Sequence, residues 1–152
     1  MSEADRWARR LASGEPIDDP VALVVAHPDD ETLWAGAALR RLRASTLVLV
    51  TDGAPDDMGD ARRLGFATRG EYAAARALEL GAAVAALEAS PRLIRYETPD
   101  QAAVRHVATI ADQLERDCAG VAAILTHPYE GGHPDHDATA LAVRLAADRL
   151  GG

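Results

Sequence analysis

The chain has 152 residues, a length that fits one domain built around one hydrophobic core. Its formal net charge of -8 argues against nucleic acid or an anionic membrane surface as the main partner. All 16 basic residues are arginines, which excludes a mechanism based on a lysine nucleophile or a Schiff base.

The N-terminal residues are polar and carry no apolar segment typical of a signal peptide. No run of residues is long and apolar enough to span a membrane. The single cysteine, Cys118, has no partner for an internal disulfide, which favours a reducing compartment. We therefore expect a cytoplasmic protein.

The first half of the chain alternates between predicted strands and helices after a lead-in over residues 1–20. Residues 21–26 are continuously apolar, which predicts a strand buried on both faces, as in a parallel sheet. A helix over about 32–43 and a second apolar strand over 45–50 follow. Glycine, proline and aspartate then predict a long loop over 51–68.

The second half continues this alternation. Asp100 follows Pro99 and is the expected N-cap of a helix. In chain order, the predicted elements are a helix over 69–87, a weaker strand over 92–96, a helix over 100–117, a strand over 121–126 and a last helix over 135–149.

Strands that alternate with helices predict an α/β fold: a Rossmann-like three-layer sandwich with a mostly parallel sheet. In the strand order 3-2-1-4, the first and fourth strands are neighbours. The gap outside their carboxyl ends is the switch point at which such folds bind ligands. We expect one domain over residues 21–152, preceded by the lead-in.

A first polar cluster, His27-Pro28-Asp29-Asp30 followed by Glu31, comes directly after the first strand. An imidazole and carboxylates at the end of a buried strand are costly unless a cation or a reaction uses them. The turn after the strand brings residue i+3 back near residue i. We therefore expect His27 and Asp30 to be a ligand pair for a divalent metal, with Asp29 beside the ion.

A second cluster, His133-Pro134-Asp135-His136, follows the fourth strand. One of its two histidines would complete a shell of two imidazoles and one carboxylate, a set typical of catalytic zinc. Such a metal lowers the pKa of a water molecule, a free carboxylate takes the proton, and a protonated imidazole stabilises an oxyanion. Either cluster alone also fits a structural role, such as an acidic first helical turn. Both together favour hydrolysis of an amide or ester.

The motifs over 26–31 and 132–136 resemble the two signatures of the PIG-L/LmbE-like zinc-dependent N-deacetylases, and the resemblance spans about residues 20–145. It implies a zinc-dependent hydrolase that removes an N-acetyl or N-acyl group from an amino sugar or a glycosylated small molecule. Fe²⁺ or another divalent ion is an alternative to zinc, because the same ligand types accept it. The implied zinc ligands are His27, Asp30 and His136.

The resemblance also implies the catalytic roles. Asp29 is the implied general base, and His133 the acid that stabilises the tetrahedral intermediate. Asp135 is expected to orient or tune an imidazole.

Members of this family carry an Arg-x-x-Glu pair on the helix after the second strand. Arg76 and Glu79 fit this spacing, so Arg76 is the implied contact to substrate hydroxyls, with Arg69 and Glu71 as a rival placement.

Family members usually run well beyond two hundred residues, and their later segments help to wall the substrate pocket. We therefore also consider a non-catalytic metal-binding or regulatory module of the same fold. A homo-oligomer that completes the pocket for a small amino-sugar substrate is a further expectation.

Overall fold

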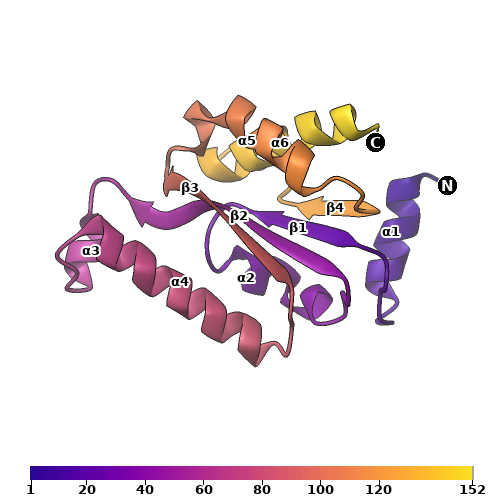
Figure 1. Ribbon diagram of the computed structural model, residues 1–152, viewed down its shortest axis with the longest axis horizontal. Coiled ribbons are helices and arrows are strands. Elements are labelled where there is room, and N and C mark those ends of the chain that lie inside the picture. The colour runs from indigo at the N-terminus through magenta and orange to yellow at the C-terminus, as the bar shows by residue number, and fades with distance from the viewer. Residues whose placement is uncertain (152) are drawn as a thin grey trace.

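A four-stranded sheet lies between two layers of helices in the computed structural model, which describes residues 1–151 (Figure 1). The sheet order is β3-β2-β1-β4, and each of its strand pairings is parallel. This arrangement confirms the predicted α/β class and strand order. The strands are β1 (Val21–Val25), β2 (Ser45–Pro55), β3 (Arg92–Asp100) and β4 (Ala123–Thr126).

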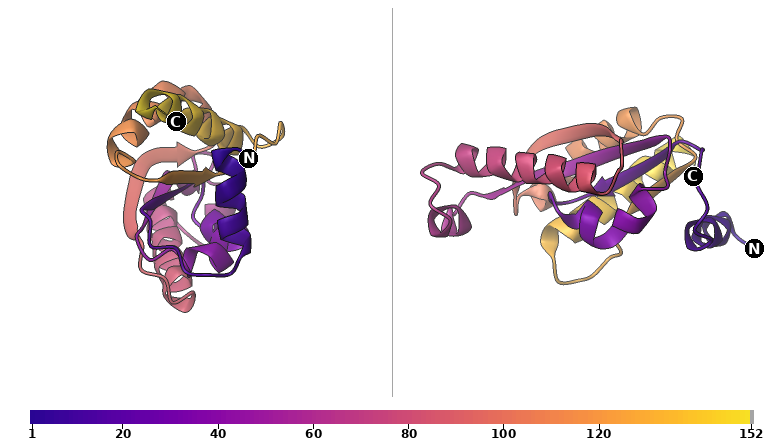
Figure 2. Two further views of the ribbon diagram at one scale, coloured as in Figure 1. Left: turned by 90° about the vertical axis from the view of Figure 1, so that its right-hand side faces the viewer. Right: turned by 90° about the horizontal axis from the view of Figure 1, so that it is seen from below.

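The helices cover both faces of the sheet, as Figures 1 and 2 show. On one face lie α2 (Asp30–Leu39) and α4 (Arg69–Ala86), and on the other α5 (Val107–Asp117) and α6 (Pro134–Leu150). Within residues 1–151, no helix has the length and apolar character needed to cross a membrane. The remaining elements are α1 (Glu3–Ala12), α3 (Gly59–Arg63) and the 3-10 turn η1 (Ala103–Arg105).

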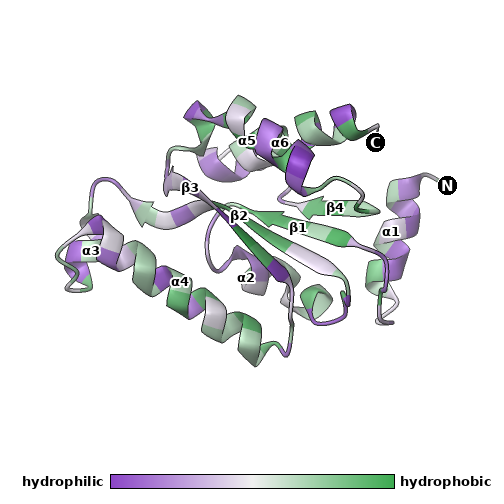
Figure 3. Cartoon of the chain, in the orientation of Figure 1, coloured by the Kyte–Doolittle hydropathy of each residue, from purple (hydrophilic) through white to green (hydrophobic). Residues whose placement is uncertain are grey.

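The continuous apolar character of β1 follows from its central place between two cores. Ala22 and Val24 pack towards α5 and α6, whereas Leu23 and Val25 pack towards α2 and α4. All five residues of β1 are buried. The apolar colour of the central strands in Figure 3 reflects this burial on two faces, which is the usual situation of a parallel strand.

The predicted lead-in contains a regular helix. Ser2 and Asp5 form a capping box at the start of α1. Trp7 and Leu11 of this helix pack against a small buried cluster of Ile17, Val21 and Leu42. The lead-in is therefore joined to the sheet by apolar contacts.

The β2 strand extends five residues beyond its predicted end at Val50. Thr51 and Pro55 still pair with β3, after shifts in register on either side of Thr51. Such irregularities bend a strand without ending it. The loop predicted over 51–68 is consequently shorter and contains α3.

The prediction that Asp100 caps a helix is wrong. Asp100 is the last residue of β3, and α5 begins only at Val107. Only Ile94 and Tyr96 of this strand contribute to the core, so its apolar signal in the sequence is weak. As an edge strand it also tolerates Pro99, which cannot donate a hydrogen bond to a neighbouring strand.

Candidate metal centre

The two polar clusters meet outside the carboxyl ends of β1 and β4, which are neighbours in the sheet. About a hundred residues apart in the sequence, they line one cavity of about 460 Å³. Asp135 does not line this cavity and is fully buried. The sequence-predicted residues that line the cavity are His27, Asp29, Asp30, Arg76, His133 and His136.

His27, Asp30 and His136 place nitrogen and oxygen donors close together. The Nδ1 atom of His27 lies 3.4 Å from Oδ2 of Asp30, and Nε2 of His136 lies 3.5 Å from Oδ1 of the same carboxylate. The backbone N–H of His27 also donates to the carboxylate of Asp30 at 2.7 Å. This hydrogen bond closes the predicted turn, in which Asp30 returns to His27. All three side chains are buried.

Three overlapping groups of side chains among residues 1–151 have donor atoms close enough together to hold a metal ion. They are His27–His133–His136, Asp30–His127–His136 and His27–Asp100–Asp135, with all donor atoms of a group within 4.8 Å of one another. Of the three expected ligands, His27 belongs to the first group, Asp30 to the second and His136 to both. Imidazole nitrogens with one carboxylate are the donors that zinc prefers, so the residues fit such an ion.

His127 belongs to one of these groups but is already engaged. Its Nε2 accepts a hydrogen bond from the backbone N–H of Ala26 at 2.9 Å, and the same nitrogen lies 3.3 Å from Asp30. A nitrogen that accepts from Ala26 has no lone pair left for a metal. The geometry therefore favours a structural role for His127 at the end of β1.

Asp135 fixes the orientation of His27. Its buried carboxylate accepts hydrogen bonds from the backbone N–H groups of Gln101 and Ala103 at 2.6 and 3.0 Å. One of its oxygens lies 3.3 Å from Nε2 of His27. Burial by itself would raise the pKa of Asp135, but His27 and these N–H donors outweigh burial and lower it.

Asp100 completes the carboxylate surroundings of His27, with an oxygen 3.2 Å from Nε2. Burial disfavours the charged imidazole, but the hydrogen bonds that His27 donates to Asp100, Asp135 and Asp30 outweigh it and raise the pKa of His27 to about 11. With Nε2–H donating to carboxylates, Nδ1 is the nitrogen that faces Asp30, and it would have to lose its proton to bind a metal. This is the carboxylate–histidine arrangement that orients metal ligands.

The pKa of Asp30 is lowered although burial alone would raise it. Hydrogen bonds from His127 and His27 both favour the carboxylate. We assign the effect mainly to His27, because Nε2 of His127 accepts from Ala26 and cannot also donate from the same atom. Asp30 is thus ionised and ready to bind a cation.

His136 is held between two other imidazoles and one carboxylate. Its ring stacks on His127 and on His133, each with a centroid separation of 4.0 Å. Its Nδ1 lies 3.0 Å from a carboxylate oxygen of Glu130, which leaves Nε2 to face Asp30. The pKa of His133 is lowered by burial and by the neighbouring His136 and His27.

Asp29 has a strained backbone and a half-exposed carboxylate. Its φ of 147° lies in a region that normally requires glycine. Its N–H donates to the buried Glu31 at 3.0 Å, and its carboxylate accepts from Arg76 at 3.1 Å. Arg76 also donates to the carbonyl oxygen of Pro28. These contacts hold the peptide bond between Pro28 and Asp29 in place.

Arg76 was expected to contact substrate, but its guanidinium is largely occupied by protein groups. Besides the Pro28 carbonyl and Asp29 it reaches Glu79 at 3.2 Å. The rival candidate, Arg69, forms an ion pair with Asp52 of β2 and lines a different cavity. Arg76 is therefore the arginine that lies at the candidate site.

Gly53 permits the close approach of β2 to the first motif. A Cβ atom at this position would lie 2.6 Å from Cδ of Pro28 and 3.3 Å from Nε of Arg76. Gly53 also has a φ of +67°, which a side chain would disfavour. Only glycine fits between the loop and Arg76.

Sequence reasoning missed Asp100 and the contact of Glu130 with His136. The sequence predicts Asp100 as a helix cap because it follows Pro99. Its place at the carboxyl end of a strand was the signal that could have identified it.

The model of the PIG-L family, described as GlcNAc-PI de-N-acetylase, matches residues 22–147. The curated proteins gave no match to this chain. Among solved structures, the A40926 pseudoaglycone deacetylase Dbv21 is 28% identical, with a TM-score of 0.67 over 86% of this chain and 60% of that chain.

Two further solved structures share the fold. The N,N'-diacetylchitobiose deacetylase from Pyrococcus horikoshii is 20% identical, with a TM-score of 0.62 over 97% of this chain and 59% of that one. The 4-carboxy-2-hydroxymuconate hydratase GalB from Pseudomonas putida is 23% identical, with a TM-score of 0.59 over 86% of this chain and 55% of that one. This chain thus spans between 55% and 60% of the length of each of these three proteins. The match to the family model covers most of the sequence, and the chain belongs to the PIG-L family.

Proposed function

We propose that this protein is a zinc-dependent hydrolase that removes an N-acetyl group from an amino sugar. The observation that carries the proposal is the cluster of buried donors on His27, Asp30 and His136, with the half-exposed carboxylate of Asp29 in the same cavity. A buried ligand set beside a half-exposed carboxylate that binds no metal is the arrangement that metal-dependent hydrolysis requires.

His27, Asp30 and His136 are the proposed ligands. A metal would be held through Nδ1 of His27 and Nε2 of His136, the ring nitrogens that lie 3.4 and 3.5 Å from the carboxylate of Asp30. When bound, zinc supplies Lewis acidity and lowers the pKa of water towards neutrality. Asp135 and Asp100 hold His27 in the required orientation, and Glu130 does the same for His136.

Asp29 is the proposed general base, which takes a proton from the attacking water. Its carboxylate is half exposed, so substrate and water reach it from the cavity. His133 is the proposed acid, which passes a proton to the leaving amine.

An amino sugar is the proposed substrate class. Tyr72, Asp60 and Gln101 line the same cavity and offer hydrogen-bonding groups that suit sugar hydroxyls. The family description and the two deacetylase neighbours support this assignment. The hydratase neighbour shows that the fold alone does not determine the reaction, so the proposal depends on the residues of the cavity.

The test measures metal content and acetate release on the same protein preparations. We expect about one equivalent of zinc per chain in the parent protein and little in the variant H27A/H136A. The parent protein should release acetate from a panel of N-acetylated sugars. The variant D29N should keep its zinc and lose most of this turnover.

Each outcome separates the alternatives. Metal without acetate release from any sugar of the panel would favour a non-catalytic metal-binding module of the same fold. A folded parent protein that takes up no zinc, iron or cobalt would contradict the metal site itself. Full activity in D29N would contradict the role of Asp29 as base.

A further inference from the structure

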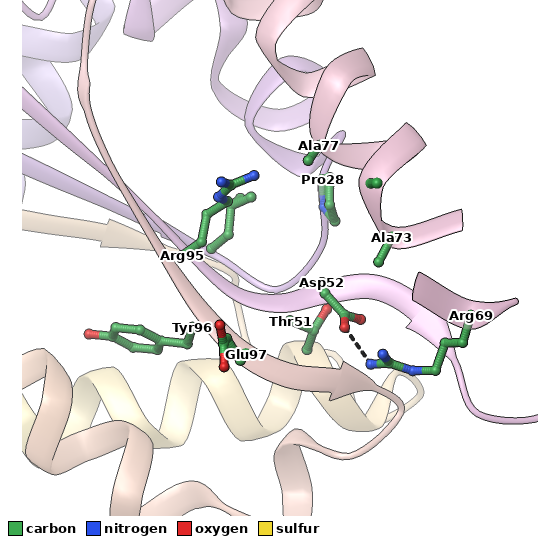
Figure 4. A pocket seen from close by; sticks show the side chains of 11 residues that line it. Pro28, Thr51, Asp52, Arg69, Ala73, Ala77, Arg95, Tyr96 and Glu97 are labelled. Atoms are coloured by element: carbon green, nitrogen blue, oxygen red, sulfur yellow. Dashed lines mark hydrogen bonds and ion pairs between the residues drawn. The ribbon is translucent and has the colours of Figure 1, made fainter. Parts of the chain in front are cut away.

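The outer edge of β3 has no strand neighbour among residues 1–151, because β3 is the end strand of the sheet. A cavity of about 560 Å³ lies between α4 and β3, and a second cavity borders the opposite face of the strand. Tyr96 and Glu97 line both cavities, and Leu93 is 45% exposed. Figure 4 shows Arg95 and Glu97 of β3 at the first cavity.

β3 carries charged residues at equal distances on either side of Tyr96, positive before it and negative after it. Arg95 and Glu97 stand one residue before and after Tyr96, and Arg92 and Asp100 stand four residues before and after it. Within the described part of the chain, Arg92, Arg95 and Glu97 form no side-chain ion pair. Three exposed charges on one strand are thus available to a partner.

Charged side chains on an edge strand normally discourage pairing, since an ordinary strand would leave them without partners. An identical strand that runs antiparallel about Tyr96 is different, because it reverses the order of the charges. Arg95 then lies opposite Glu97 of the second copy, and Glu97 opposite Arg95. Opposite charges at directly facing positions stabilise a pair of strands, whereas like charges destabilise it. In-register parallel pairing would place Arg95 beside Arg95.

We propose that two copies of this chain associate through β3, antiparallel and centred on Tyr96, into one continuous sheet. The cavity between α4 and β3 of one copy then faces the same cavity of the other copy across the pair of strands. Arg92 of the second copy lies near the end of β3 that carries Asp100, whose carboxylate is part of the candidate metal centre. The interface therefore reaches the cavity of each copy from outside.

Charge reversal tests the interface by sedimentation of the full chain over a series of concentrations. In R95E, and separately in E97R, both facing pairs become like-charged, so the dissociation constant of the dimer should rise about tenfold or more. The double variant R95E/E97R restores opposite charges in both pairs and should restore the dimer. The matched control R144E reverses an exposed arginine of α6 and should leave the dimer unchanged.

Circular dichroism of every variant separates loss of the dimer from loss of the fold. A parent protein that stays monomeric at every concentration would show that these charges protect the edge, and would overturn the proposal. A dimer that resists both single reversals, or is not restored by the double reversal, would place the interface elsewhere. These results do not depend on enzymatic activity, so they stand apart from the test of the proposed function.

Discussion

Arg76 of α4 binds both the carbonyl oxygen of Pro28 and the carboxylate of Asp29, 47 residues away in the sequence. The buried Glu31 accepts the N–H of Asp29 from the other side. The carbonyl and the N–H of one peptide bond are therefore both fixed by side chains. This restraint holds Asp29 at a φ of 147°, which an unrestrained aspartate would avoid.

Replacement of Arg76 by alanine should lower the rate constant kcat about a hundredfold, because a small displacement of a catalytic group is enough for such a loss. Zinc content should stay unchanged, since Arg76 contacts none of the proposed ligands. Steady-state kinetics on R76A, with R144A as the control for a lost exposed arginine, measure this. A rise in KM alone would instead identify Arg76 as a substrate contact.

Glycine at position 29 should relieve the backbone strain. We expect D29G to be more stable than D29A by about 1 kcal/mol, since both variants lose the ion pair with Arg76 but only glycine favours the observed φ. Urea denaturation of the two variants, without metal, measures the difference. Equal stabilities would mean that position 29 relaxes to an ordinary conformation once its carboxylate is removed.

Replacement of Asp135 by asparagine should weaken both the fold and metal binding. The NH2 group of the new amide cannot accept a hydrogen bond, yet it would face the N–H donors of Gln101 and Ala103 or the ring of His27. One buried group therefore loses its partner, at a cost of about 2 kcal/mol. Zinc affinity should fall about ten- to hundredfold, because the orientation of His27 is lost.

Denaturation and zinc competition against a chelator test these two effects of D135N. The exposed D112N, which loses only a surface contact with Arg149, is the control and should change neither quantity. Parent-like zinc affinity in D135N would contradict the orienting role of Asp135.

Stability should fall in alkaline solution because of two buried groups beside Asp117. Burial, together with Asp117, raises the pKa of the Cys118 thiol from 9.0 to about 11. Burial and the hydrogen bond that Tyr96 donates to Asp117 at 2.9 Å likewise raise the pKa of Tyr96.

The unfolded chain loses these protons at lower pH than the folded protein does. The free energy of unfolding should therefore be fully retained below about pH 9 and decrease as the pH rises towards about 11. Urea denaturation at several pH values measures this. In C118A/Y96F the decrease over the same range should be smaller, and an equal decrease would assign it to other groups.

The sequence by itself determined the α/β class, the parallel sheet and the order of its strands. Continuous apolar runs such as residues 21–25 are explained only by burial on both faces, and alternation with helices limits the topology to a few choices. The same reasoning placed both His/Asp motifs at neighbouring strand ends. The turn from His27 to Asp30 is local, so its geometry could also be predicted.

Only the tertiary structure decided which distant groups surround these motifs. Asp100, Asp135 and His27 meet because β1 and β3 end where α6 begins, although 108 residues separate His27 from Asp135. The direction of Arg76 towards Asp29 depends on how α4 crosses the sheet. Such contacts leave no periodic pattern in the sequence, because each depends on packing between elements that are far apart along the chain.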